Sequence, residues 1–371
     1  MKIGLVRRGF SATGGAESYL RRLADALETA GHEPVLFTGS DWPRDQWPAH
    51  RQLVTVNSRT PRAFAEDVAR LSERHCDRLF SLERVWRCDC YRAGDGVHRA
   101  WLQRRAQTEP AWRRWFRHAN PKHRAILALE ASLFAEGGAK TIIANSRMVR
   151  DEIVRIYGTP SERIHVVYNG LPGEYFQPVG PETRERERAA RQLTPTDYVI
   201  LFAGTGWERK GLAHALAAVE RLPDTLRARL LIAGRGNPKP FLRSLSAHSR
   251  ERVQFLGPIR DVQALYAAAD IFVAPTLYDP FSNACLEALA AGLPVLTTPA
   301  NGFAEIIEPG LEGDVFDTAD RTEGNALAAL LTAWADPTRL ATARLACAAK
   351  ATGFTIEKNV AQTLDILLGL P

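Results

Sequence analysis

The 371-residue chain contains a glycine-rich loop, Gly204–Gly211, with the residue types of a phosphate-binding site. The loop follows the apolar segment Tyr198–Ala203, contains Arg209 and Lys210, and leads into an expected helix. Lysine occurs only seven times against 41 arginines, so a lysine here is unusual for this sequence. Backbone N–H groups at a helix N-terminus and adjacent cations together stabilise a phosphate. A solvated loop is the alternative, but the strand–loop–helix context favours a phosphate site.

This loop matches neither of two common nucleotide-binding motifs, and the first glycine pair of the chain is weak evidence for a phosphate site. A P-loop requires a Gly-Lys-Ser/Thr ending, which is missing. In a dinucleotide fingerprint, a glycine would stand where the sequence has Arg209. Gly14 and Gly15 precede the first expected helix, where an ordinary tight turn is as good an explanation as a phosphate contact.

A second loop, Tyr278–Glu287, places two acids eight positions apart at the end of an expected strand. Asp279 would lie at the strand's end and Glu287 two turns along the following apolar helix. A buried carboxylate in such a helix needs a partner, because an unpaired buried charge is costly. Ribose hydroxyls would serve, as they do for acids in other nucleotide sites.

The cysteines indicate neither a disulfide framework nor a metal site. They are odd in number, contain no CxxC pair, and are expected to be free thiols. Asp89 and Asp95 do not form a DxD-type site, so we expect no metal. The five cysteines are Cys76, Cys88, Cys90, Cys285 and Cys347.

The formal net charge of +6 calls for an anionic partner or surface, and it is concentrated in the segment Arg99–Arg124. This segment has eight basic residues against the single acid Glu109, interleaved with aromatic residues. Lys and Arg near an anionic leaflet with tryptophan at the interface favour peripheral membrane docking. A helix pair with core tryptophans and solvated arginines is the alternative. The aromatic residues are Trp101, Trp112, Trp115 and Phe116.

The chain alternates short apolar strands with amphipathic helices in both halves, which predicts an α/β fold with two doubly wound parallel sheets. We expect an N-terminal domain over residues 1–177, a linker over 178–197 and a C-terminal domain over 198–355. The last helix, about residues 356–371, is expected to pack back on the first domain. Two such domains would face a central cleft.

The sequence suggests neither a membrane span nor a signal peptide. The uncharged stretch 288–304 is broken by glycines and prolines, and only four apolar residues precede Arg7 at the N-terminus. We therefore expect a cytoplasmic protein, with peripheral association at the inner face of the membrane.

The ordered set of motifs resembles retaining nucleotide-sugar glycosyltransferases of the GT-B fold, glycosyltransferase family 4. The resemblance extends over most of the chain. It is carried by Gly14-Gly15, the block from Ala144-Asn145-Ser146 to Asn169-Gly170, Arg209-Lys210-Gly211, and Asp279 to Glu287 followed by Ala290-Ala291-Gly292-Leu293-Pro294-Val295. Within the family the layout is similar to that of lipopolysaccharide core glucosyltransferases. This similarity implies that the protein transfers a hexose to a membrane-associated glycan, and that the hexose is glucose supplied by UDP-glucose.

Carried over to this sequence, the resemblance implies that Arg209 and Lys210 bind the donor diphosphate and that Glu287 binds the ribose hydroxyls. Asp279 would face the transferred sugar; the family more often has Glu there, so this side chain is one methylene shorter. The backbone N–H groups of Phe281, Ser282 and Asn283 would lie beside Asp279, and Gly14 and Gly15 would let the N-terminal loop close over the phosphates.

The resemblance also implies that the first domain binds the acceptor. Its loop Arg92–His98 contains an acid and a histidine between glycines, so Asp95 and His98 are expected to contact the acceptor or the reaction centre. A histidine that is simply hydrogen-bonded or exposed is an equally good explanation for His98. No cofactor is implied, since Arg209 and Lys210 would stabilise the leaving diphosphate, which would itself take the acceptor's proton.

Two other function classes remain open at this point. A nucleotide-sugar epimerase or a phosphorylase could share the two-domain architecture, although a phosphorylase would need one of the few lysines for pyridoxal. A basic nucleic-acid-binding protein would explain the charge of Arg99–Arg124, but it would leave Arg209-Lys210 and the two acids unexplained.

Overall fold

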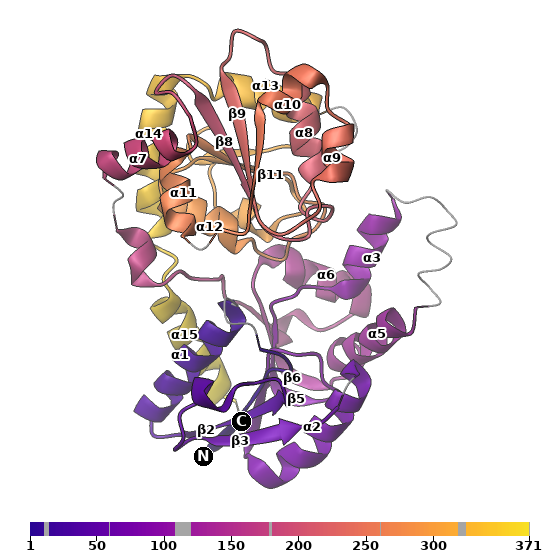
Figure 1. Cartoon of the computed structure of the whole chain (residues 1–371). Coiled ribbons are helices and arrows are strands. Elements are labelled where there is room, and N and C mark those ends of the chain that lie inside the picture. The colour runs from indigo at the N-terminus through magenta and orange to yellow at the C-terminus, as the bar shows by residue number, and fades with distance from the viewer. Residues whose placement is uncertain are drawn as a thin grey trace. The chain divides into compact units, whose positions relative to one another are not determined.

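The structure, a computed structural model, describes residues 1–10, 15–58, 60–107, 120–177, 180–259, 261–317 and 324–370. The chain forms two compact units (Figure 1). The first comprises Met1–Tyr168 and Ile356–Pro371, and the second comprises Asn169–Thr355.

The first unit is built on a seven-stranded sheet with the order β3-β2-β1-β4-β5-β6-β7, in which all neighbours are parallel. The order reverses between β1 and β4, and at such a switch point the carboxyl ends of the strands leave a crevice for a ligand. The strands are β1 (Lys2–Val6), β2 (Glu33–Gly39), β3 (Gln52–Val56), β4 (Arg78–Ser81), β5 (Cys88–Ala93), β6 (Ala139–Ala144) and β7 (Ile164–Val166).

Two helices of this unit begin at residues whose side chains cap them. Thr60 accepts a hydrogen bond from Ala63 N at the start of α2, and Ser146 does the same from Val149 N for α6. The helices are α1 (Gly15–Thr29), α2 (Pro61–His75), α3 (His98–Ala106), α5 (Pro121–Phe134), α6 (Arg147–Tyr157) and α15 (Ile356–Leu368), with short 3₁₀ turns at Arg44–Gln46 and Ser161–Arg163.

The last helix, α15, belongs to the first unit. It lies beside α1 (Figure 1), and the two share an apolar core to which α15 contributes Ile356, Val360 and Leu367. The Tyr19 hydroxyl donates to Thr363 Oγ1 at 3.0 Å within this contact. The chain therefore returns to its first unit after completing the second.

The second unit is built on a six-stranded parallel sheet with the order β10-β9-β8-β11-β12-β13. Here the order reverses between β8 and β11. The strands are β8 (Tyr198–Ala203), β9 (Ala228–Ala233), β10 (Val253–Gly257), β11 (Ile271–Ala274), β12 (Val295–Thr297) and β13 (Gly313–Val315). Strands β8, β9 and β11 are almost continuously buried, as expected for a parallel sheet covered by helices.

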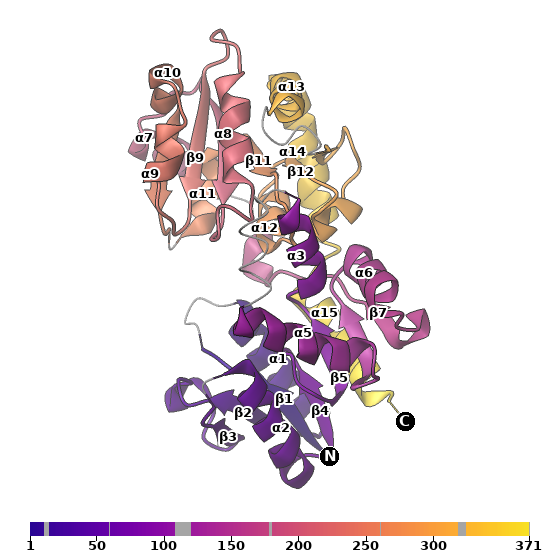
Figure 2. The same cartoon turned by 90° about the vertical axis from the view of Figure 1, so that its right-hand side faces the viewer.

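Helices cover both faces of this sheet. Figure 1 shows α8 and α10 on one side of the strands and α7 and α11 on the other, and Figure 2 shows α13 beside α8. The helices are α7 (Pro181–Ala190), α8 (Leu212–Glu220), α9 (Lys239–Arg243), α10 (Ala247–Glu251), α11 (Val262–Ala268), α12 (Asn283–Ala290), α13 (Asn325–Ala333) and α14 (Pro337–Ala351), with 3₁₀ turns at Gly173–Phe176 and Gly302–Glu305. The predicted fold class, two doubly wound parallel sheets, is confirmed.

The structure differs from the sequence prediction at the linker. The division between the units falls at Tyr168/Asn169 rather than in residues 178–197. Helix α7, inside the expected linker, packs on α11 because Arg184 and Arg188 donate to the carbonyls that end α11 and pair with Asp270. The charged run is thus a docked helix of the second unit.

Among the described residues, no helix combines the length and apolar composition needed to cross a membrane.

Candidate active site

The switch point of the second sheet brings together the two loops that the sequence singles out. The loop after β8 carries Arg209 and Lys210, and the loop after β11 carries Asp279. Because β8 and β11 are parallel neighbours, their carboxyl ends lie side by side. The fold therefore places Lys210 beside Asp279.

The glycine-rich loop folds tightly against the end of β11. Gly211 has a φ of 78°, and a Cβ at this position would lie 1.8 Å from the Pro275 carbonyl oxygen. A glycine is therefore required where the loop enters α8. The Trp207 Nε1–H group donates to the Gly204 carbonyl at 3.1 Å, and its ring packs against Phe255. This anchoring holds the loop that presents the two cations.

Arg209 is fixed through its backbone. Its carbonyl accepts from Leu277 N at 2.8 Å and from Thr276 Oγ1 at 2.9 Å. Within the described part of the chain, no hydrogen bond or ion pair engages its half-buried guanidinium. Arg209 thus offers an uncompensated positive charge on an anchored loop.

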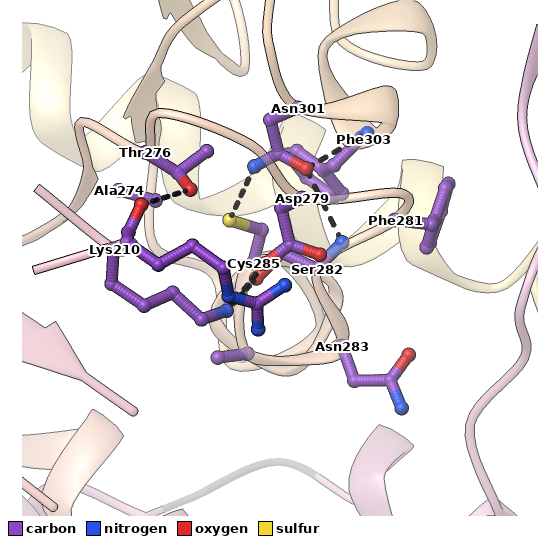
Figure 3. Close-up of polar contacts among 12 residues, drawn as sticks. Lys210, Ala274, Thr276, Asp279, Phe281, Ser282, Asn283, Cys285, Asn301 and Phe303 are labelled. Carbon is purple, nitrogen blue, oxygen red and sulfur yellow. Dashed lines mark hydrogen bonds and ion pairs between the residues drawn. The ribbon is translucent and has the colours of Figure 1, made fainter. Parts of the chain in front are cut away.

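Lys210 points toward Asp279 and Ser282 (Figure 3). Its Nζ lies 2.5 Å from Asp279 Oδ2 and 3.4 Å from Ser282 Oγ. The side chains of Lys210 and Asp279 are 14% and 8% exposed, so the ion pair is largely shielded from water. In such a setting the attraction between the charges is much stronger than at a protein surface.

Asn301 holds the loop between β11 and α12. Its Oδ1 accepts from Ser282 N at 3.2 Å and Phe303 N at 3.1 Å, while its Nδ2 donates to Thr297 Oγ1 at 3.0 Å. The Ser282 N–H group, which the sequence analysis places beside Asp279, therefore donates to Asn301 in the structure. Asn301 was missed by the sequence reasoning; the Asn301-Gly302 turn dipeptide was its one available signal.

Ser282 immediately precedes the first turn of α12 and stands between Phe281 and Asn283 in the chain. The Phe281 ring is buried against Phe303 with centroids 5.9 Å apart. The side chain of Asn283 is exposed, and its Oδ1 accepts from Asn169 Nδ2 at 2.7 Å. The backbone N–H groups that open α12 add the positive end of the helix dipole to the charge of Lys210.

Glu287 lies on α12, and the Tyr266 hydroxyl donates to its Oε2 at 3.0 Å. Tyr266 thus supplies a protein partner for this acid, which the sequence reasoning did not foresee. Burial raises the pKa of Glu287 to about 7, although the Tyr266 hydrogen bond and the Lys210 charge act to lower it. The carboxyl group consequently titrates near neutral pH, and the charge of Lys210 reaches it.

In the first unit, Asp95 and His98 have different surroundings. The Asp95 side chain is 70% exposed and lies 3.7 Å from Arg84 Nη1. The His98 ring shares a 3.0 Å hydrogen bond with His123. Burial and then the charge of Arg84 lower the pKa of His98 to about 4, so the ring is neutral at physiological pH.

A buried carboxylate organises the start of α3, where His98 lies. Glu130 is fully buried and accepts from His98 N at 2.7 Å, Arg99 N at 3.0 Å and the Tyr157 hydroxyl at 2.7 Å. It also pairs with Arg84 at 3.2 Å. Glu130 therefore caps α3 from α5, a long-range role that local sequence patterns did not reveal.

Two other groups of predicted site residues lie partly outside the described residues. Gly14 is outside them, whereas Gly15 is the first residue of α1. The basic segment is described at residues 99–107 and 120–124. There Arg104 pairs with Glu152 at 2.9 Å and Arg99 stacks over Tyr157 at 5.2 Å, so part of its charge is used within the protein. The arginines Arg113, Arg114 and Arg117 lie outside the described ranges.

The arrangement in the second unit can bind an anion at the positive end of α12. The carboxylates of the same site can accept hydrogen bonds from a neighbouring polyhydroxylated group. Arg209 and Lys210 supply two cations, and Asp279 and Glu287 supply hydrogen-bond acceptors. Across the described ranges, no group of three or more histidine, cysteine, aspartate or glutamate side chains could hold a metal ion.

Family comparisons agree with this geometry. Residues 13–174 match the family described as Glycosyltransferase Family 4, and residues 197–336 match Glycosyl transferases group 1. The chain belongs to these glycosyltransferases and has the GT-B fold, so it is an enzyme that transfers a glycosyl group. Among the alternatives weighed on the sequence, the family match selects the transferase.

The chain is similar to two curated relatives. It is 32% identical over 177 residues to an uncharacterized glycosyltransferase of Methanocaldococcus jannaschii, a match covering 46% of this chain and 45% of that protein. It is 27% identical over 306 residues to the lipopolysaccharide glucosyltransferase WaaG of Escherichia coli, covering 79% of each chain. The chain thus spans less than half of the first relative and about four fifths of the second.

Solved structures support the fold assignment. The crystal structure of WaaG, described as a glycosyltransferase involved in lipopolysaccharide biosynthesis, superposes with a TM-score of 0.79 at 24% identity and 100% coverage of both chains. HepE of Anabaena in complex with UDP superposes with a TM-score of 0.75 at 18% identity, again with 100% coverage of both. At these identities the likeness shows the fold.

Proposed function

We propose that the protein transfers glucose from UDP-glucose, with retention of the anomeric configuration, to a membrane-associated glycan of the lipopolysaccharide core type. The observation that carries the proposal is the cluster of Lys210, Asp279 and Ser282 at the start of α12. Arg209 lies on the same loop as Lys210. The name of WaaG and the UDP held by HepE support the choice of donor and acceptor.

In this proposal the diphosphate binds at the start of α12 between Arg209 and Lys210. Cleavage of the sugar–phosphate bond builds negative charge on the leaving diphosphate, and preorganised cations stabilise that charge more in the transition state than in the ground state. Glu287, farther along α12, accepts hydrogen bonds from the ribose hydroxyls. The donor diphosphate and the Asp279 carboxylate would then compete for the ammonium group of Lys210.

Retention is assigned to attack on the same face of the sugar from which the diphosphate leaves. The acceptor hydroxyl forms the new glycosidic bond, the sugar–phosphate bond breaks, and the acceptor's proton passes to the departing phosphate oxygen. Asp279 is paired with Lys210 at 2.5 Å, and an ammonium-paired carboxylate is a poor nucleophile. Its proposed role is to hold the transferred sugar by its hydroxyls.

The acceptor side rests on the first unit and on charge. Asp95 and His98 are proposed to contact the acceptor or reaction centre, and the Arg99–Arg124 segment is proposed to dock on an anionic membrane from the cytoplasmic side. Lys and Arg residues near such a surface contribute about 1 kcal/mol each. Metal independence is part of the proposal, because two cations are available for the diphosphate.

The experiment is calorimetric titration with UDP, GDP and ADP, with and without EDTA, of the wild type and Glu287→Ala. Binding of UDP with a Kd of about 1–100 μM, unchanged by EDTA and lost in the variant, supports the donor site and its base. If GDP or ADP binds more tightly than UDP, the proposed donor becomes a GDP-sugar or an ADP-sugar. Failure of all three nucleotides to bind contradicts the proposal.

A further inference from the structure

A small pocket of about 200 Å³ lies against the amino-terminal parts of β9 and β10 in the second unit. The loops that carry Lys210 and Asp279 follow the carboxyl ends of β8 and β11, so the pocket lies toward the opposite edge of the same parallel sheet. Its volume is below that of the usual ligand pocket, which suits a small molecule or an ion and not a nucleotide sugar. The lining residues are Arg191, Gln192, Leu193, Arg229, Leu231, Glu251, Arg252, Val253 and Gln254.

Two arginines of the lining have unused N–H groups. Arg191 donates through Nη1 to the Glu187 carbonyl at 2.8 Å and to Glu187 Oε2 at 2.7 Å, while its Nε is buried without a partner in the described structure. Arg229 donates through Nη1 to the Glu251 carbonyl, and no ion pair engages it among the described residues. In both, the Nε–Nη2 side of the guanidinium makes no bond within the described chain. This side is a pair of parallel donors suited to bidentate binding of phosphate or carboxylate.

The charges around the pocket favour an anion. Its lining has three arginines against one acid, Glu251. Arg252 is engaged by the Leu222 carbonyl at 3.0 Å and by Asp224 at 2.7 Å, so its charge is compensated within the protein. Arg229 is therefore the lining arginine without a carboxylate partner in the described chain.

Gln192 has a backbone conformation that favours glycine. Its φ is 57°, and no other non-glycine residue of the described chain has a positive φ. It follows α7, where Leu193 N donates to the Arg188 carbonyl at 2.9 Å, the helix-ending turn in which glycine is the usual residue. Glutamine there places an amide side chain on the pocket lining at a cost in backbone strain, and strained positions of this kind cluster at functional sites.

We propose that this pocket binds phosphate, as the free anion or as the phosphate group of a small phosphomonoester. The Nε–Nη2 donors of Arg191 and Arg229 pair with phosphate oxygens, and the amide of Gln192 donates to another. The inference does not depend on the proposed glycosyl transfer, because the pocket shares no residue with the cluster around Lys210. Three apolar side chains of the lining give a surface for the carbon part of an ester: Leu193, Leu231 and Val253.

The test measures binding of orthophosphate and glycerol 3-phosphate, with glycerol as the neutral control, by calorimetry and phosphorus NMR. It uses the full-length wild type and Lys210→Ala/Asp279→Asn, which removes the cation at the other edge of the sheet without leaving its carboxylate unpaired. At least one phosphate probe should bind both proteins with a Kd of about 1 mM or below. In both backgrounds Arg229→Gln should weaken that binding about tenfold, the loss expected for a charge-assisted hydrogen bond.

Arg243→Gln is the matched control, because it removes the same charge at an exposed position outside the pocket, and it should leave phosphate binding unchanged. Gln192→Gly separates binding from folding: glycine relieves the backbone strain and should raise the melting temperature, while the lost amide should weaken phosphate binding severalfold. The inference is overturned if neither phosphate probe binds the Lys210→Ala/Asp279→Asn variant, or if glycerol binds as tightly as glycerol 3-phosphate. Phosphate binding that is unchanged in Arg229→Gln or in Gln192→Gly also overturns it.

Discussion

The ammonium of Lys210 lies 2.5 Å from the carboxylate of Asp279, although the two residues are 69 positions apart in the chain. The pair joins the loops after β8 and β11, the two strands between which the strand order reverses. Its environment is largely dry, so each charge depends on the other. Stability and donor binding therefore compete for the same lysine.

Lys210→Ala should lower both stability and turnover. It leaves the buried Asp279 carboxylate unpaired, which costs about 3–5 kcal/mol of unfolding free energy. It also removes a cation from the leaving group, which should cost turnover about 100-fold or more. Thermal unfolding and steady-state kinetics measure the two effects separately.

The double variant Lys210→Ala/Asp279→Asn separates these effects. It removes the unpaired charge, so most of the stability should return while turnover stays low. Lys239→Ala, an exposed lysine on α9, is the control and should change neither quantity. Near-normal turnover in Lys210→Ala would remove Lys210 from the mechanism.

Glu287 predicts a pH dependence of stability and of nucleotide binding. Its pKa is raised from 4.5 to about 7, so between these values the folded protein keeps a proton that the unfolded chain has released. The stability due to this group is fully present below pH 4.5 and is lost as the pH rises through 7. UDP affinity should rise over pH 6–8, because the carboxylate is the better acceptor for ribose hydroxyls. Calorimetry and thermal unfolding of wild type and Glu287→Gln check this, and a wild type as pH-independent as the variant would refute it.

Tyr266→Phe should raise the pKa of Glu287 and so shift that pH dependence to higher pH. The Tyr266 hydroxyl donates to Glu287 and acts to lower its pKa, so without it the carboxyl group should ionise at a higher pH. UDP binding at pH 7 should weaken severalfold, about the loss of one hydrogen bond. Tyr198→Phe is the matched control, since the Tyr198 hydroxyl is buried without a partner in the described structure. Equal effects of the two variants would exclude a specific role for Tyr266.

The sequence predicted the parts of the site that are contiguous. Arg209 and Lys210 are adjacent on one loop, and Asp279 and Glu287 lie eight positions apart on the segment that runs from the end of β11 into α12, so local spacing was enough to find them. Asn301 and Tyr266 were not found, because they reach the site across 19 and 21 positions of the chain and their types suggest no chemistry by themselves. The fold, rather than a motif, makes these two residues part of the site.

The strands show the same limit. Apolar runs such as β8 were found almost to the residue, whereas β3, β4 and β5 were not assigned. Strand β5 contains Asp89, which accepts from Leu79 N at 2.7 Å, and the buried Arg92, which stacks over Tyr19 at 4.6 Å. Tertiary partners compensate these charges, so the strand lacks the apolar pattern on which the prediction depended.

Glu130 is expected to control the position of His98. Glu130→Ala would orphan two backbone N–H groups of α3 and leave Arg84 without its buried partner, at a cost of about 3–5 kcal/mol. Glu130→Gln keeps one acceptor oxygen, so it should lose less stability yet still reduce kcat if His98 contacts the reaction centre. Thermal unfolding and kcat are compared with those of Glu136→Gln, an exposed control. A kcat unchanged in Glu130→Gln would leave the residue with a structural role.

Neutralising the basic segment should weaken membrane binding without affecting the donor site. Arg113, Arg114 and Arg117 changed together to Gln remove three positive charges, and at about 1 kcal/mol each the partition onto anionic vesicles should fall roughly 100-fold. UDP affinity should stay constant, because the proposed donor site is built from residues of the second unit. The triple variant Arg74→Gln, Arg186→Gln and Arg243→Gln makes the same charge change at exposed positions elsewhere. Sedimentation with phosphatidylglycerol vesicles distinguishes the two triples, and equal losses in both would show that binding follows net charge and not this segment.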